Sequence, residues 1–171
     1  MAALIGLSDE QVASVVANAG SVATLVAANY NAPGQVVISG EGAAVEAAMR
    51  EAKSAGAKLA VKLPVSGAFH SPLLQEAGAQ MSALIADAPF QDARIPIYQN
   101  VTARPATTAG DLKEALQAQM TSPVRWSQTV QNMINDGATH FYELGPGKVL
   151  AGLIKRIDKS VTVQSAESSV C

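Results

Sequence analysis

Val22-Ala23-Thr24-Leu25-Val26-Ala27-Ala28 and Val36-Val37-Ile38-Ser39 are the stretches that decide the fold of the first third of this chain. Both are rich in aliphatic and β-branched residues, which favour strands. Between them, Asn31-Ala32-Pro33-Gly34 contains the residue types that tight turns require. The pattern therefore predicts two consecutive strands joined by a turn.

Helix and strand patterns lie on both sides of this pair. A helix is predicted from Ser8 to Gly20, because Ser8 and Gln11 have the spacing of a capping box. A second helix is predicted from about Gly42 to Gly56, and further strands are predicted at 1–7 and 58–63. The resulting order, β-α-β-β-α-β, is the split βαβ or ferredoxin-like arrangement. We therefore expect a ferredoxin-like small subdomain over residues 1–63.

Residues 64–171 show helix and strand patterns without a clear pairing among the strands. Parallel strands need cover on both faces. We therefore expect this part to be an incomplete layer of a larger α/β subdomain, with an exposed apolar surface over residues 64–164; the alternative is a compact but irregular α/β domain. The predicted helices are Ser71–Ala88, Asp111–Met120, Ser127–Asn135 and about 149–157, and the predicted strands are Ile95–Asn100, Thr139–Leu144 and Val161–Gln164.

The composition excludes several classes of protein. Hydrophobic residues make up 49% of the 171 residues and charged residues 15%, which is typical of a folded globular chain. The net charge of −2 and the lack of a basic run argue against nucleic acid as a partner. A single cysteine, Cys171, favours a reducing cytoplasm. We expect no secretion leader, no membrane span and no metal site, and no Gly-x-Ser-x-Gly motif is present.

His70 is the strongest catalytic candidate. It lies in Gly67-Ala68-Phe69-His70-Ser71-Pro72, just before a predicted helix whose first turn would have Ser71 as N-cap and Pro72 at the first helical position. The positive end of that helix disfavours a second positive charge, and a neutral imidazole is what a general base needs. Gly67 and Ala68 leave space beside it, and Phe69 supplies an apolar wall. The alternative is a structural histidine packed on Phe69.

Gln119 is the candidate for orienting that base. Pro123, four residues later, has no N–H, so the Gln119 carbonyl loses its usual helical donor. A free carbonyl could accept the imidazole N–H and fix its tautomer, as the aspartate does in a Ser-His-Asp triad. The alternative is an ordinary helix end whose carbonyls meet water.

Three asparagines and one glycine-rich loop are weaker candidates. Asn29, Asn31 and Asn100 fall at the ends of predicted strands, where they could hydrogen-bond a substrate or simply make turns. Gly145-Pro146-Gly147-Lys148 resembles an anion-binding loop before a helix, without the spacing of a P-loop. The other histidine, His140, begins a predicted strand, and we interpret it as structural.

Taken together, several stretches resemble one family, the malonyl-CoA:acyl-carrier-protein transacylases, along their C-terminal part. The resemblance runs almost from end to end of the chain and rests on the stretches Met1-Ala2-Ala3-Leu4-Ile5-Gly6-Leu7, Asn29-Tyr30-Asn31-Ala32-Pro33-Gly34-Gln35-Val36-Val37-Ile38-Ser39-Gly40, Leu63-Pro64-Val65-Ser66 with Phe69-His70-Ser71, Ser122-Pro123-Val124-Arg125-Trp126, and Tyr142-Glu143-Leu144-Gly145-Pro146-Gly147-Lys148-Val149-Leu150.

The resemblance implies a ferredoxin-like subdomain inserted in an α/β-hydrolase-like one. It implies transfer of malonyl from coenzyme A, through an acyl-serine, to the phosphopantetheine thiol of acyl carrier protein in fatty acid or polyketide synthesis. The coenzyme A thioester would be a substrate, and no cofactor would be tightly bound. His70 stands at the family's catalytic histidine, and Gln119 at the glutamine whose main-chain carbonyl holds it. Phe69 stands where methylmalonyl-selective relatives carry a smaller residue, so its ring is expected to exclude the extra methyl.

The chain departs from the family in one respect that affects activity. About 120 family residues, with the Gly-His-Ser-x-Gly serine, the malonyl-binding arginine and the oxyanion-hole donors, have no counterpart in this sequence. Without the nucleophile, covalent catalysis is lost, so we expect the chain alone to transfer no malonyl. Three hypotheses follow: part of an acyltransferase that needs the missing N-terminal half as partner, a non-catalytic module that binds carrier protein or another subunit, or a plain ferredoxin-like domain with an unrelated extension.

Overall fold

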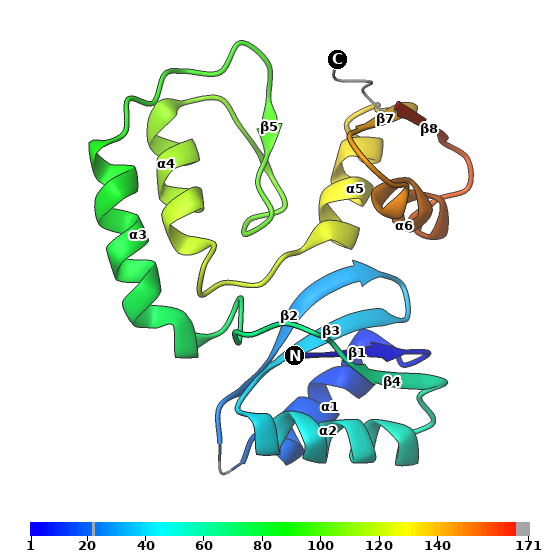
Figure 1. Cartoon of the computed structure of the whole chain (residues 1–171). Coiled ribbons are helices and arrows are strands. Elements are labelled where there is room, and N and C mark those ends of the chain that lie inside the picture. The colour runs from blue at the N-terminus through cyan, green and yellow to red at the C-terminus, as the bar shows by residue number, and fades with distance from the viewer. Residues whose placement is uncertain (22, 167–171) are drawn as a thin grey trace.

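A computed structural model of the chain describes residues 1–21 and 23–166. The first part forms a four-stranded sheet of order β2-β3-β1-β4, in which all neighbours are antiparallel, and Figure 1 shows α1 and α2 together on one face of it. The predicted β-α-β-β-α-β order is therefore confirmed. Its elements are β1 (Ala2–Ile5), α1 (Asp9–Ala19), β2 (Leu25–Ala32), β3 (Gln35–Gly40), α2 (Gly42–Ser54) and β4 (Leu59–Lys62).

The core of this part lies between the sheet and the two helices. Leu4, Ile38 and Val45 are each at most 1% exposed, and small residues such as Ala48 let the helices pack closely on the strands. The predicted capping box is present, since Ser8 accepts from the Gln11 amide and the Gln11 side chain accepts from the Ser8 amide.

The hairpin differs from the prediction in one respect. The predicted turn began at Asn31, but β2 continues to Ala32 and only Pro33 and Gly34 form the turn, with Gly34 at φ +72°. Pairing with β3 overrides the turn preference of the asparagines, because Asn29 lies opposite Val37 in the ladder. The predicted start of this strand, Val22, lies outside the described residues, as does Cys171.

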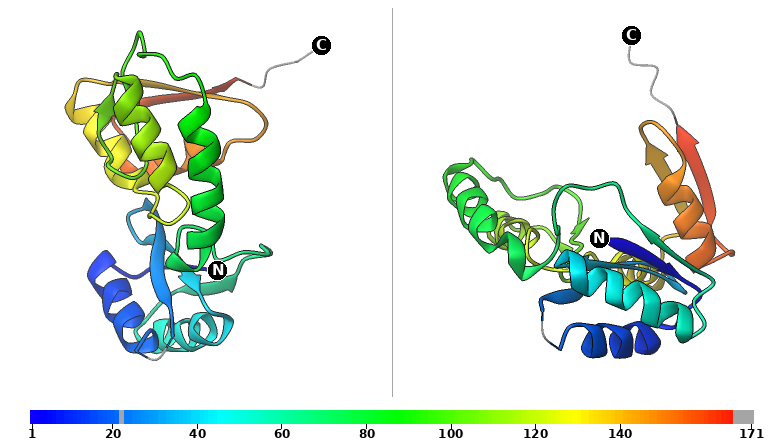
Figure 2. Two further views of the ribbon diagram at one scale, coloured as in Figure 1. Left: turned by 90° about the vertical axis from the view of Figure 1, so that its left-hand side faces the viewer. Right: turned by 60° about the horizontal axis from the view of Figure 1, so that its bottom comes forward.

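The rest of the chain forms two groups of elements. Figure 1 shows α3 and α4 side by side with the β5 hairpin beside them, whereas α5, α6, β7 and β8 gather on the other side of the molecule. Figure 2 shows the two groups above the small sheet from two further directions. The elements are a 3-10 turn (Pro72–Leu74), α3 (Gln75–Asp87), β5 (Ile97–Tyr98), β6 (Pro105–Ala106), α4 (Ala109–Ala118), α5 (Trp126–Asn135), β7 (His140–Leu144), α6 (Val149–Ile157) and β8 (Thr162–Ala166).

The strands of this part do pair, contrary to our expectation. β5 pairs antiparallel with β6, a strand that the sequence analysis missed, and β7 pairs in parallel with β8 over five residue pairs. The predicted strand Ile95–Asn100 is reduced to two residues, because the chain turns at Asn100. Ser71 does not cap α3 with its side chain, and a 3-10 turn precedes that helix.

Exposed apolar side chains gather in the part of the chain where we expected them. Among residues 1–21 and 23–166, twelve of the fourteen large hydrophobic side chains that are exposed lie between residues 64 and 164, with Leu144, Ile95 and Val149 more than 70% exposed. Across residues 1–21 and 23–166, none of the helices combines the length and apolar character that crossing a membrane requires. In the same residues, no three His, Cys, Asp or Glu side chains gather as metal ligands do.

Candidate active site

His70 has an uncommon backbone conformation. Its φ is +60°, a left-handed value that few residues other than glycine adopt, although histidine is among those that adopt it more often. Two contacts accompany this conformation: the His70 amide donates to the Met120 carbonyl (3.1 Å), and the Ser71 hydroxyl donates to the Ala68 carbonyl (2.5 Å). Ser71 is fully buried. Outliers of this kind gather at functional sites, where the surrounding structure holds them in place.

The His70 ring contacts the Gln119 main chain. Nδ1 of His70 lies 3.0 Å from the Gln119 carbonyl oxygen. A carbonyl oxygen only accepts, so this contact requires a proton on Nδ1 and leaves Nε2 free to accept a proton in the neutral ring. α4 ends at Ala118, two residues before the predicted end, and the Gln119 side chain turns back to donate to the Ser122 carbonyl (3.0 Å).

The Phe69 ring lies against Gly67 in the loop before His70. A Cβ at Gly67 would lie 3.2 Å from two atoms of the Phe69 ring, so the missing side chain of this glycine makes room for the ring. The expectation of space beside His70 stays a prediction. Phe69 as a residue is 40% exposed, so part of its surface is open to a ligand.

The three asparagines lie on two different elements. Asn29 is within β2, Asn31 is the next-to-last residue of β2, and Asn100 is in the turn between β5 and β6. All three are partly buried. Within the described residues, none of their side-chain amides has a hydrogen-bond partner, and none contacts His70 by a hydrogen bond.

The segment 119–125 connects the elements that carry these residues. Its first residues accept from His70, as described above. Val124 donates to the Ala28 carbonyl (2.8 Å) and accepts from the Tyr30 amide (2.9 Å), on either side of Asn29. The Arg125 amide donates to the Asn100 carbonyl (2.9 Å). One short segment of backbone therefore joins His70, the strand with Asn29 and the turn with Asn100.

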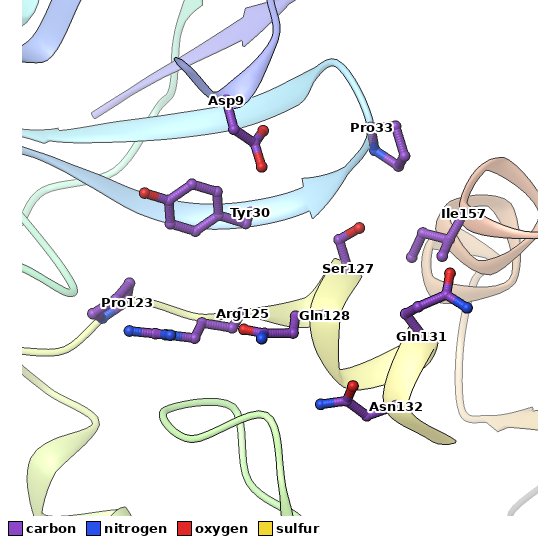
Figure 3. A pocket seen from close by; sticks show the side chains of 10 residues that line it. All are labelled: Asp9, Tyr30, Pro33, Pro123, Arg125, Ser127, Gln128, Gln131, Asn132 and Ile157. Atoms are coloured by element: carbon purple, nitrogen blue, oxygen red, sulfur yellow. The ribbon is translucent and has the colours of Figure 1, made fainter. Parts of the chain in front are cut away.

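A cleft of about 640 Å³ lies beside this segment. Asp9 and Tyr30 lie on one side of it, and Arg125 and Gln128 face them from the other (Figure 3). Burial, and to a lesser degree the charge of neighbouring Glu10, raises the pKa of Asp9. The sequence analysis missed these residues, although the polar spacing of Ser127, Gln128 and Gln131 along one helix could have indicated them. His70 does not line this cleft.

The helix that follows the glycine-rich loop binds an anion from the chain itself. Both oxygens of the Glu143 carboxylate accept from amides in the first turn of α6, at Leu150 (3.0 Å) and Ala151 (2.8 Å). The resemblance of Gly145-Pro146-Gly147-Lys148 to an anion-binding loop is therefore not supported, because Glu143 uses these helix donors. His140 is exposed on β7, with Nδ1 2.9 Å from the Thr139 hydroxyl.

Comparison with known proteins places these features in a family. Residues 3–170 match the family described as the acyl transferase domain. The malonyl CoA-acyl carrier protein transacylase of Bacillus subtilis is 41% identical over 174 residues, which cover 98% of this chain and 54% of that protein.

Solved structures give the same result. An acyl carrier protein S-malonyltransferase from Vibrio cholerae superposes with a TM-score of 0.94 at 40% identity, covering 97% of this chain and 54% of that one. A malonyl-transacylase in complex with a type II PKS acyl-carrier protein gives a TM-score of 0.95 at 33% identity, covering 98% and 54%. The chain thus spans about half the length of the relatives that it matches. It belongs to the acyl transferase domain family.

Proposed function

We propose that this chain supplies the C-terminal part of an acyltransferase that moves malonyl from coenzyme A to the phosphopantetheine thiol of acyl carrier protein. The observation that carries the proposal is the 3.0 Å contact between His70 Nδ1 and the Gln119 carbonyl. The two residues are 49 positions apart, and the family resemblance implies that they are the catalytic histidine and the glutamine whose carbonyl holds it. We place the boundary between the two subdomains at residues 63 and 64, and we keep the expectation of a cytoplasmic setting.

In the proposed mechanism, His70 acts through Nε2. This nitrogen takes the proton of a serine hydroxyl as the serine oxygen attacks the thioester carbon of malonyl-CoA. The carbon–sulfur bond breaks, and the coenzyme A thiolate leaves with the proton from His70. The carrier-protein thiol then gives its proton to His70 and attacks the acyl-serine, and that proton returns to the serine oxygen. The Gln119 carbonyl keeps the ring in the tautomer that every step requires.

The serine of this mechanism is not among the 171 residues. We therefore propose that the nucleophile comes from a segment equivalent to the other half of the relatives. The exposed apolar side chains between residues 64 and 164, among them Leu144 at 79% and Ile95 at 73% exposure, support this, because a missing segment would bury them. The side-chain amides of Asn29, Asn31 and Asn100 have no hydrogen-bond partner among the described residues, and we propose that they hydrogen-bond the substrate.

The test mixes this chain with the N-terminal half of the Bacillus subtilis relative and measures malonyl transfer to carrier protein. The chain alone is expected to give no transfer, and the mixture is expected to give turnover. In the mixture, His70→Ala should lower the rate by about 10²–10⁴-fold, the usual contribution of a general base. His140→Ala is the matched control, since it removes the other histidine without touching the site, and it should leave the rate unchanged.

Two results would contradict the proposal. Equal rates for His70→Ala and the unsubstituted chain would remove His70 from the chemistry. Turnover by the chain alone would show that its nucleophile is not the one proposed here.

The second candidate function is a non-catalytic module that binds carrier protein or another subunit, and the exposed apolar surface favours it. It predicts a complex with carrier protein but no transfer in the mixture. Binding of the phosphopantetheine form of carrier protein, measured by calorimetry on the same samples, separates the two candidates. Binding without turnover would favour the module.

A further inference from the structure

We infer that Pro123 is a positioning residue: it keeps segment 119–125 out of helix α4, so that this one stretch of backbone holds His70, the strand with Asn29 and the turn with Asn100 in register. The catalytic consequence of this inference rests on the function proposed above. Its structural part concerns the folded chain alone and is measured without turnover.

The hydrogen bonds of the segment support the inference. The carbonyls of Gln119 and Met120 accept from His70, and both main-chain groups of Val124 pair with β2. The Arg125 amide pairs with Asn100. Main-chain groups withdrawn from water need partners, and here the Gln119 and Met120 carbonyls, both groups of Val124 and the Arg125 amide find theirs in elements that carry candidate site residues. A helix through the same residues would use these groups internally.

The local conformation shows why a proline is needed. Gln119 is still helical, with φ −62° and ψ −32°, and the Thr121 amide donates to the Ala118 carbonyl at 3.3 Å. The chain is thus in a helical turn when it reaches Ser122. The next helical bond would run from the amide of residue 123 to the Gln119 carbonyl, the same oxygen that His70 uses.

Proline prevents that bond in two ways. It has no N–H, and its ring disfavours the helical conformation of the residue before it, Ser122. Any other residue at position 123 would offer a donor four positions after Gln119, in direct competition with the imidazole. The helix would also gain a turn by removing Val124 from β2.

The experiment measures the tautomer of His70 by ¹⁵N NMR, which is simple in a chain with only two histidines. The unsubstituted chain is expected to show the Nδ1–H form. Pro123→Ala adds a donor and favours helix, and Pro123→Gly adds a donor but disfavours helix. In Pro123→Ala, the ratio of Nδ1–H to Nε2–H should fall by about fivefold, the effect of losing one ordinary hydrogen bond. Pro146→Ala, in the exposed loop before α6, is the proline control and should keep the original ratio.

Each outcome decides the inference. A lower ratio of Nδ1–H to Nε2–H in both variants supports competition by the new N–H. A lower ratio in Pro123→Ala alone supports extension of α4. The original ratio in both variants, or an Nε2–H form in the unsubstituted chain, overturns the inference. So does loss of the folded state in both variants while Pro146→Ala folds, because Pro123 would then have a structural role only.

The NMR result is independent of the transfer assay. A mixture that transfers no malonyl, with tautomers that respond as expected, would refute the proposed function and leave the positioning role intact. Transfer that depends on His70, with a tautomer ratio that stays the same in the Pro123 variants, would support the proposed function and refute the positioning role.

Discussion

Asn132 holds the turn that contains Asn100, and its removal is a quantitative test of the site's construction. Its side-chain amide donates to the Ala103 carbonyl at 2.7 Å. Ala103 is fully buried and has a φ of +56°, so the hairpin reverses direction there in an unfavourable conformation. Asn132 also lines the cleft beside segment 119–125 (Figure 3). Asn132→Ala would leave the Ala103 carbonyl without a partner.

The expected cost follows from that unpaired carbonyl. Leaving a buried acceptor unsatisfied costs about 1–3 kcal/mol. With a urea slope of about 2 kcal/mol/M, the midpoint of unfolding should fall by about 0.5–1.5 M. The assay is urea unfolding followed by circular dichroism. In the mixture with the N-terminal half, the same variant should weaken substrate binding more than turnover, because Asn100 is proposed to bind substrate and His70 is held by other contacts.

Gln131→Ala is the matched control for this prediction. Gln131 is the neighbouring residue on α5 and is exposed, and its amide contacts only Asn135 at 3.4 Å on the same helix. Pairs of this kind contribute about 0.2–0.5 kcal/mol. If Asn132→Ala were no less stable than Gln131→Ala, the hydrogen bond to Ala103 would not be what holds the hairpin.

Further predictions concern the core, the pH dependence, the exposed surface and selectivity. Val45→Ala, at 1% exposure, should lower the free energy of unfolding by about 2–4 kcal/mol in the same urea assay. The hydrogen bond from Tyr98 to Asp136 raises the pKa of Tyr98 above its ordinary value of 10.0. The contribution of this hydrogen bond to stability is therefore present at neutral pH and is lost as the pH rises through the raised pKa. Tyr98→Phe should abolish the loss of stability above about pH 10 in unfolding curves. Leu144→Lys should reduce binding of a hydrophobic dye and self-association measured by ultracentrifugation, because Leu144 is 79% exposed on β7. Phe69→Ala should raise the methylmalonyl-to-malonyl ratio of the mixture by about 10–200-fold in competition assays, since the ring would no longer exclude a methyl group.

The small sheet was predictable from sequence because local patterns determine it. The capping box at Ser8 and the periodicity of the two helices set the element order, and that order leaves few topologies open. The free carbonyl of Gln119 was also foreseeable, since the missing donor at Pro123 is a covalent property of the residue. The contact of this carbonyl with His70 depends on the fold: no spacing rule brings residues 70 and 119 together.

Other features depended on pairing between distant segments. Asn29 and Asn31 have the composition of a turn, but pairing with β3 and with Val124 keeps them in a strand. The glycine-rich loop looked like an anion site because its donors were visible in the sequence, whereas their partner, Glu143, became evident only from the geometry. The Ser71 hydroxyl had an alternative acceptor, the Ala68 carbonyl, which single-residue capping preferences do not consider.

The segment that positions His70 and the strands that leave the sheet incomplete are different parts of the molecule. β7 and β8 form a two-stranded parallel sheet, and sheets of this type are stable when more strands and covering helices bury both faces. None of the hydrogen bonds between segment 119–125 and His70, β2 or Asn100 involves β7 or β8. Adding the other half of a relative should therefore protect the β7 and β8 amides from hydrogen exchange and create turnover, while the His70 tautomer stays as it is in the chain alone. A tautomer that changed on mixing would mean that the base is aligned by the completed sheet and not by Gln119.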